Sequence, residues 1–201
     1  KYASWDLENQ AVNVSSKPSR GIFTGSLDSG LIFERDLAVT DNNYLQTLEP
    51  RLLYVYSQYE DQRDIPIFDS TDMTFSYNQL FRDDRFSGRD RVGDTNQLTL
   101  ALSSRFHNDS GLEKAHVSVG QIQYFSDRKV TLFNLPGDDE RKPGSAIVGE
   151  LSYQLDTHWR TSSYLEWDTG ANQLQVGNFQ FQYQSDINHI LNLGYRYRTD
   201  P

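Results

Sequence analysis

Apolar and polar residues alternate one by one along several long segments of this sequence, and a period of two residues is the pattern of a β-strand with two different faces. The clearest segment lies near the end, where Leu191, Leu193, Tyr195 and Tyr197 alternate with Asn192, Gly194, Arg196 and Arg198. The same alternation recurs at 97–103, 147–156 and 179–184. Helical spacing fits these segments poorly, so the sequence predicts an all-β fold.

The length of the predicted strands narrows the fold further. About nine strands are expected, at 2–8, 21–35, 44–59, 95–106, 112–126, 145–156, 158–168, 172–184 and 188–198. Many are near or above ten residues, whereas strands of soluble proteins have about five or six. A tilted strand needs about 9–11 residues to cross the hydrocarbon layer of a membrane. The sequence therefore predicts part of an antiparallel, up-and-down transmembrane β-barrel. The mean hydropathy of -0.69 is compatible with it, because one strand face and the loops are polar.

Short and long connections alternate between the predicted strands. Polar turn-forming residues make short turns at 107–111, 156–158 and 185–188. The junctions between these turns include two long, charged connections at 60–94 and 127–144 and a short one at 168–172. Outer-membrane barrels have short periplasmic turns and longer extracellular loops. We therefore expect the two long connections to be extracellular loops.

Aromatic residues near both ends of a strand would mark the two membrane interfaces of such a barrel. Trp159 and Trp167 fall on the same face of one predicted strand. They would lie about 20 Å apart along the membrane normal when the tilt is included. Tyr195 and Tyr197 are further candidates for an aromatic girdle. The alternative is that the tryptophans belong to the core of a soluble β-sandwich.

Composition excludes several other classes. The longest unbroken apolar run is 52–56, far shorter than the roughly 20 residues of a transmembrane helix. Twelve Tyr, eleven Phe and three Trp are too many for a disordered chain. A net charge of -9 opposes general nucleic-acid binding. With no cysteine, the chain has no disulfide, no thiol nucleophile and no cysteine-ligated metal.

No motif for chemistry is present in the sequence. The four histidines at 107, 116, 158 and 189 lack metal-binding spacing, and the glycines do not form a phosphate-binding loop. We therefore predict no catalytic residue, no metal ligand and no cofactor site.

The most unusual stretch is 82–94, in which four arginines are interleaved with four aspartates. A calcium loop is one interpretation, but the ligand order of such loops is absent and each carboxylate has a competing arginine nearby. A network of bidentate Arg–Asp pairs that orders a long loop is the preferred interpretation.

Several motifs in series resemble the C-terminal barrel domain of the LptD family, the lipopolysaccharide-assembly proteins of Gram-negative outer membranes. They are QTLEPR at 46–51, DIPIFDS at 64–70, QLFR at 79–82, RFSGRDR at 85–91, NQL at 96–98, VSVGQIQYF at 117–125 and NHILNLGYRY at 188–197. The resemblance runs through most of the chain.

This resemblance implies a location in the outer membrane and a role in releasing lipopolysaccharide into the outer leaflet. It also implies the lipoprotein LptE as a partner inside the barrel, and periplasmic Lpt bridge proteins that act through a domain absent here. Family barrels close with about 26 strands. The chain is therefore expected to be an internal segment, without the lateral gate and the cysteines of the family.

The matching positions are given structural roles. Candidates for loop or lumen ion pairs are Glu49, Arg51, Asp69, Arg82, Arg85, Asp90 and Arg91. Candidates for facing the lumen are Glu150, Gln154, Arg196 and Arg198. Pro50 is expected at a bulged or unpaired point of its strand.

Two other functions stay open from sequence alone. One is a soluble β-sandwich that binds carbohydrate through exposed aromatic residues. The other is a barrel glycoside hydrolase, which would need two carboxylates about 5–10 Å apart in a cleft. The apolar strand faces would contact a second sheet in the sandwich and lipid in the membrane barrel.

Overall fold

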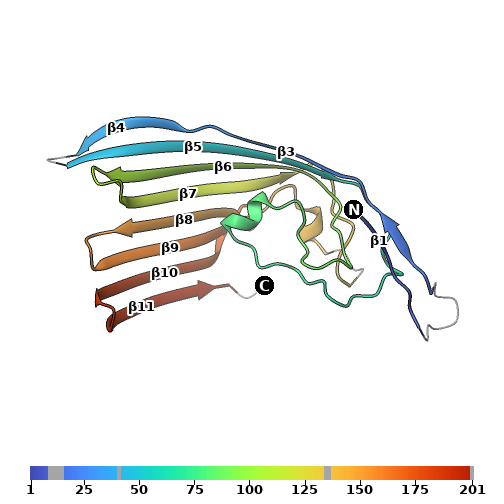
Figure 1. The fold of residues 1–201 in the computed structure, drawn as a ribbon. Helices are drawn as coiled ribbons and strands as arrows, with labels where there is room; N and C mark the ends of the chain where they lie inside the picture. The colour runs from blue at the N-terminus through green and yellow to red at the C-terminus, as the bar shows by residue number, and fades with distance from the viewer. Residues whose placement is uncertain (9–15, 40–41, 134–136, 200–201) are drawn as a thin grey trace. The chain divides into compact units, whose positions relative to one another are not determined.

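Strands dominate the computed structural model, which describes residues 1–8, 16–39, 42–133 and 137–199. The strands are β1 (Tyr2–Ser4), β2 (Ser19–Gly21), β3 (Thr24–Gly30), β4 (Phe33–Val39), β5 (Asn42–Ser57), β6 (Thr95–Asn108), β7 (Glu113–Tyr124), β8 (Ile147–Gln154), β9 (Trp159–Asp168), β10 (Gln173–Asp186) and β11 (His189–Arg198) (Figure 1). Two 3-10 helices, η1 (Tyr77–Phe81) and η2 (Asp139–Arg141), lie in the long connections. In the described residues, no helix has the length and apolar character needed to cross a membrane.

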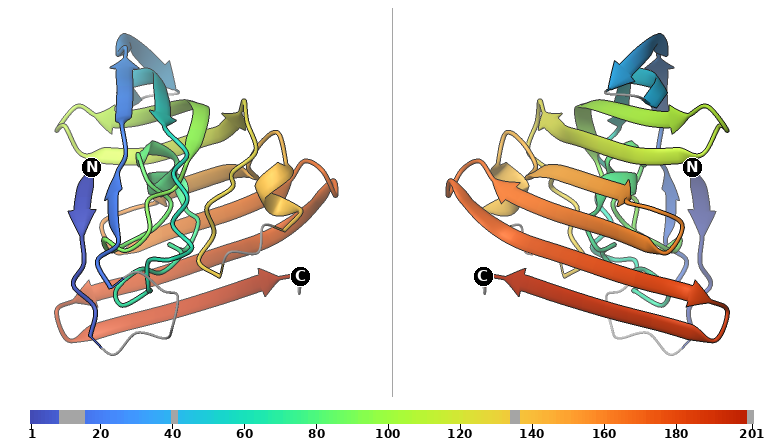
Figure 2. Two further views of the ribbon diagram at one scale, coloured as in Figure 1. Left: turned by 90° about the vertical axis from the view of Figure 1, so that its right-hand side faces the viewer. Right: turned by 90° about the vertical axis from the view of Figure 1, so that its left-hand side faces the viewer.

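Nine of these strands form one sheet in the order β11-β10-β9-β8-β7-β6-β5-β3, with β4 also paired to β5. From β5 to β11 each strand therefore pairs with the next strand in sequence. The pairs from β7 to β11 are antiparallel, and Figure 2 shows β10 and β11 side by side as long strands. The predicted all-β, antiparallel, up-and-down arrangement of about nine strands is confirmed.

Two predicted strands at the start of the chain differ from the structure. The segment 2–8 contributes only β1, which pairs with β2 in a separate two-stranded sheet. The predicted strand 21–35 is divided into β3 and β4 by an interruption at 31–32.

Pro50 explains this interruption. Its carbonyl oxygen accepts a hydrogen bond of 3.0 Å from the N–H of Leu31. In an antiparallel strand, the N–H and C=O groups of one residue point toward the same neighbouring strand. Because the carbonyl group of Pro50 points toward residues 31–32, an N–H group at position 50 would point there too, but proline has none. The ladder is therefore incomplete at the point where β3 ends, and Pro50 occupies a locally unpaired position as expected.

Four tight turns, those that follow β6, β8, β9 and β10, each contain an Asp or Asn whose side chain accepts backbone N–H groups. Asp156 accepts those of His158 and Trp159 at 2.7 and 2.9 Å, and Asp186 those of Asn188 and His189 at 2.7 and 3.0 Å. The other two turns use Asn108 and Asp168 in the same way. The turns are short because one side chain satisfies the donors that a two- to four-residue connection exposes.

The chain divides into two compact units. Unit 1 comprises residues 1–28, 53–98 and 123–143, and unit 2 comprises 29–52, 99–122 and 144–201. Most of the buried apolar residues belong to unit 1: Ile22, Leu53, Val55, Ile65, Leu80, Phe86, Val92, Val130 and Leu132. The long connections thus have an apolar core of their own, part of which is the cluster of Phe86, Val130 and Leu132.

Unit 2 has the opposite distribution. Its apolar strand residues are exposed, among them Leu151 at 46%, Phe179 at 48% and Tyr195 at 67%. Polar residues such as Thr99 and Ser118 are buried, with 0% and 2% exposed. Within unit 2 the described strands belong to one sheet, whereas a β-sandwich would have a second sheet packed on the apolar face.

Candidate functional site

The strand register of unit 2 separates a polar face from an apolar face. One row of paired residues runs Ser118, Glu150, Tyr164, Asn178 and Arg196, and the next runs His116, Ser152, Ser162, Gln180 and Gly194. A third row runs Gln154, Arg160, Gln182 and Asn192. All three rows fall on one face, because their members are separated by two residues along each strand.

The apolar face is built from the intervening positions. Its rows include Val117, Leu151, Ser163, Phe179 and Tyr195, and also Ala115, Tyr153, Thr161, Phe181 and Leu193. At one end Trp159 stacks on Phe181, with ring centroids 4.7 Å apart, and packs at a tilt against Tyr183, with centroids 4.3 Å apart. Trp167 pairs with Ile147 and Leu174 at the other end. Tyr195 and Tyr197 lie on this face too, but between the two ends.

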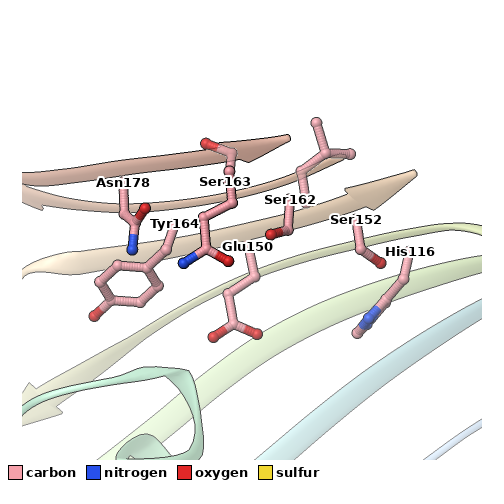
Figure 3. A pocket seen from close by; sticks show the side chains of 9 residues that line it. His116, Glu150, Ser152, Ser162, Ser163, Tyr164 and Asn178 are labelled. Carbon is pink, nitrogen blue, oxygen red and sulfur yellow. The ribbon is translucent and has the colours of Figure 1, made fainter. Parts of the chain in front are cut away.

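The polar face contains a hollow of about 240 Å³, lined by His116, Glu150, Leu151, Ser152, Ser162, Ser163, Tyr164, Asn178 and Gln180. Figure 3 shows Glu150, Tyr164 and His116 extending from neighbouring strands on the same side of the sheet. The hollow arises because Ser152 and Ser162, a directly paired couple, are small where the neighbouring row has Glu150 and Tyr164. The Tyr164 hydroxyl is 2.6 Å from Glu166 Oε1, which fixes the ring.

A chain of hydroxyl groups leads into this face from β6. Ser103 Oγ is 2.8 Å from Ser118 Oγ, which is 2.7 Å from His116 Nε2. Arg105, farther along β6, lies between two carboxylates, with Nη1 2.8 Å from Glu113 Oε2 and Nε 3.3 Å from Glu49 Oε1. These bonds connect the polar side chains of β5, β6 and β7.

The structure places the four lumen-facing candidates on the polar face. Glu150 and Arg196 belong to the same row, Gln154 to the row that contains Arg160, and Arg198 pairs with Val176 beside Glu166. The Gln154 amide donates to the backbone oxygen of Asp156 at 2.6 Å.

In unit 1 the segment 82–94 is held chiefly by bonds between side chains and backbone. The Asp90 carboxylate accepts the N–H groups of Phe68 and Asp69, both at 2.6 Å, and the indole N–H of Trp5 at 3.3 Å. Burial alone would raise the pKa of Asp90, but hydrogen bonds to Asp69, Phe68 and Trp5 outweigh burial and hold that pKa below its ordinary value. The loop therefore retains a buried carboxylate in its charged form.

Arginines of unit 1 bind in the complementary way, by donating to backbone carbonyl oxygens, although the buried Nε atoms of Arg20 and Arg91 have no hydrogen-bond partner among the described residues. Arg20 donates to the carbonyl oxygens of Asp90 and Arg89 at 2.8 and 2.6 Å and to Gln62 Oε1 at 2.7 Å. Arg91 donates to the carbonyl oxygen of Ile65 at 2.7 Å. Both side chains are almost completely buried.

Arg85 and Asp94 hold the connection 60–94 against the connection 127–144. Arg85 donates to the carbonyl oxygens of Asp94 and Val130, and its Nη2 lies 3.4 Å from Asp94 Oδ1. Asp94 in turn accepts the N–H groups of Lys129 and Val130 at 2.9 Å.

The expected bidentate Arg–Asp network is thus largely replaced by backbone partners. Of the ion-pair candidates, Arg85 pairs with Asp94 and Glu49 with Arg105. Asp69 accepts the N–H of Arg89 at 2.9 Å, and Asp90 and Arg91 bind backbone groups. Arg51 lies in β5, and Arg82 follows η1. Every loop residue offers a backbone hydrogen-bonding group. A buried charge therefore finds a backbone partner more readily than a second charged side chain.

Among the residues that the structure describes, no group of three His, Asp or Glu side chains could hold a metal ion.

Comparison with known proteins decides the family. A family model described as "LptD: LPS transport system D" matches residues 1–201. The chain belongs to the LptD family. An LPS-assembly protein LptD of Pseudomonas putida (strain GB-1) is 42% identical over 221 residues, covering 99% of this chain and 24% of the relative. One of Ectopseudomonas mendocina (strain ymp) is 44% identical over 205 residues, with 98% and 22% covered. One of Xanthomonas axonopodis pv. citri (strain 306) is 39% identical over 212 residues, with 100% and 26% covered.

The resemblance expected from the motifs is therefore confirmed, and this LptD segment spans about a quarter of the length of these curated relatives. The relatives are named for assembly and the family for transport, not for catalysis.

Several residues that organise this LptD segment escaped sequence analysis. Trp5 and Gln62 lie in irregular segments and Arg20 in the three-residue strand β2, so no periodicity marks them. One signal was available for Tyr164, because it has the same parity as Ser162 and Glu166 on the polar side of its strand.

Proposed function

We propose that this chain forms part of the wall of an outer-membrane β-barrel that delivers lipopolysaccharide to the cell surface, as the names of its relatives indicate. The observation that carries the proposal is the inverted sheet of unit 2. Its apolar side chains are exposed and its polar side chains are buried or line a hollow. This distribution suits lipid on one side and a polar lumen on the other.

The proposal assigns each part of the chain a place. The connections 60–94 and 127–144 are extracellular loops, although residues 134–136 lie outside the described residues. The short turns that follow β6, β8 and β10 face the periplasm. LptE occupies the lumen, and the periplasmic bridge proteins act through other parts of the full-length protein. The segment has no catalytic role, and Trp159 and Trp167 mark the two membrane interfaces.

Two adjacent residues of β8 test the membrane orientation. Leu151→Lys places a charge on the apolar face, at a cost of about 2–4 kcal/mol near the middle of the membrane, whereas Ser152→Lys places it on the polar face. In the full-length protein, we expect Leu151→Lys to lower the amount of folded barrel and Ser152→Lys to leave it nearly unchanged. Equal effects of the two substitutions would contradict a lipid-facing surface.

Depletion of the full-length protein tests the transport role. Newly made lipopolysaccharide should then fail to reach the cell surface, and expression of the unaltered protein should restore it. Normal surface arrival during depletion would refute the proposed function.

A further inference from the structure

The hollow on the polar face continues across the sheet. A second hollow of about 500 Å³ is lined by Arg160, Ser162, Gln180, Phe181, Gln182, Asn192, Leu193 and Gly194. Ser162 and Gln180 line both hollows. The two hollows are therefore adjacent and together extend from β7 to β11, and we call the pair the amide groove.

The strand register explains why the sheet is hollowed along this line. The floor is the row that contains Ser152, Ser162 and Gly194, which are all small, with Gln180 between the last two. One wall is the row of Glu150, Tyr164 and Asn178, and the other is the row of Arg160, Gln182 and Asn192. Larger side chains thus stand on both sides of a row in which Ser152, Ser162 and Gly194 are small and only Gln180 among these four positions is long.

The walls and floor offer hydrogen-bonding groups of both kinds. Each of Asn178, Gln180, Gln182 and Asn192 has an amide that both donates and accepts, and Ser152 and Ser162 add hydroxyl groups. The rings among the lining residues on the polar face are the phenol of Tyr164, held by Glu166, and the imidazole of His116. Phe181 and Leu193 come from positions whose side chains belong to the apolar face.

The lining residues of the groove include no cluster of cationic side chains that would hold an anionic ligand, and Arg196, which pairs with Asn178 at the end of one wall row, is not among them. Arg160 is the only arginine among its lining residues, and Glu150 adds a carboxylate. Phosphate groups are bound by clustered Arg or Lys side chains or by free backbone N–H groups. Here the backbone N–H groups pair between strands.

We propose that the amide groove binds uncharged sugar units of the glycan carried by lipopolysaccharide, an inference that rests on the proposed function. Sugar hydroxyl groups donate and accept, as the amide and hydroxyl side chains of the groove do. The Tyr164 ring supplies one apolar surface for the C–H groups of a sugar ring. A protein partner would instead favour a surface with several buried aromatic or arginine anchors.

The test uses the full-length protein in two bacterial strains, one with a long neutral glycan on its lipopolysaccharide and one without it. Ser162→Phe fills the point where the two hollows meet, and Thr161→Phe places the same ring on the apolar face as a matched control. Ser162→Phe should slow surface arrival of the glycan-bearing lipopolysaccharide about 3- to 10-fold, the equivalent of one hydrogen bond, and leave the short form unchanged. Thr161→Phe should affect neither.

A photo-cross-linking residue at position 180 identifies what enters the groove. Cross-links to lipopolysaccharide are expected in the long-glycan strain and should be nearly absent in the other. Cross-links of equal yield in both strains, or to polypeptide alone, would overturn the proposal. Gln180→Lys distinguishes recognition of charge from recognition of hydroxyl groups. If this variant retained more lipopolysaccharide, the ligand would be phosphate, and the proposal of uncharged sugars would also be overturned.

The two proposals fail in different ways. If Ser162→Phe slows both forms equally, the groove does not recognise the glycan, while the transport role stands. If depletion of the whole protein leaves both forms arriving normally, the transport role itself is refuted.

Discussion

The indole N–H of Trp5 donates a hydrogen bond of 3.3 Å to the carboxylate of Asp90, which lies 85 residues later in the chain. The same carboxylate accepts the N–H groups of Phe68 and Asp69. Asp90 therefore joins the start of the chain to the first long connection. Arg20 strengthens this junction, because it binds the carbonyl oxygens of Arg89 and Asp90 and contacts the Trp5 ring, with 5.3 Å between Cζ and the ring centroid.

Removal of the Asp90 carboxylate should loosen this connection. Asp90→Ala leaves two backbone N–H groups without an acceptor, at a cost of about 1–3 kcal/mol each. Limited proteolysis of the full-length protein should then cut within 60–94 faster than in the unaltered protein. Asp61→Ala is the control, because Asp61 pairs with Arg63 in solvent and should change little. Equal cleavage of the two variants would contradict the anchoring role of Asp90.

Acid should have a related effect. The pKa of Asp90 is lower in the folded loop than in the unfolded chain, so its ionisation favours the folded loop. This contribution is complete above the unfolded-state pKa, about 3.9, and is lost as the pH falls through the lower pKa of the folded loop. Digestion by pepsin between about pH 4 and pH 2 should accelerate more steeply in the unaltered protein than in Asp90→Asn, which has no group to titrate there. Parallel pH profiles would argue against this linkage.

Gly88 and Gly111 form a matched pair for a test of backbone geometry. Both have positive φ, 75° and 76°, a region that favours glycine. A Cβ at Gly88 would lie 2.4 Å from the carbonyl oxygen of Asp69, whereas one at Gly111 would meet nothing within 4 Å. Gly111→Ala should cost about 1 kcal/mol from conformation alone, and Gly88→Ala clearly more. Hydrogen exchange of the Arg89 amide, which is bonded to Asp69, measures the difference; similar protection in both variants would contradict the contact.

Pro50 and Leu48 make a second pair on one strand. Leu48 pairs with Phe33 of β4, and its N–H points to the same side as the carbonyl oxygen of Pro50. Leu48→Pro should remove a ladder hydrogen bond and cost at least about 0.5–1.5 kcal/mol. Pro50→Ala should be nearly neutral, because the opposite strand is already interrupted. Thermal unfolding of the full-length barrel in detergent measures both; a larger loss for Pro50→Ala would refute this explanation of the interruption.

The strands of unit 2 could be predicted because their pattern is local. The alternation of Leu191 and Leu193 with Asn192 and Gly194 follows from the backbone of a single strand. The break between β3 and β4 could not be predicted, because its cause, Pro50, lies on the partner strand. The loop contacts were also beyond prediction. Asp90 and Arg91 stand next to oppositely charged residues in the sequence, but Asp90 binds the backbone at 68–69 and the indole of Trp5, and Arg91 binds the backbone of Ile65.

Buried apolar residues are concentrated in unit 1 and scarce in unit 2, so the two parts of the chain depend on different surroundings. The sheet of unit 2 has few buried apolar side chains, Ile122 and Val148 among them, and its exposed apolar face depends on whatever surrounds it. The long connections of unit 1 enclose their own apolar cluster and their own charges. A change of acyl-chain length or detergent should therefore act on the sheet, whereas salt and acidity should act on the connections. Thermal unfolding should therefore respond to detergent and acyl-chain length through the sheet, and to salt and pH through the long connections.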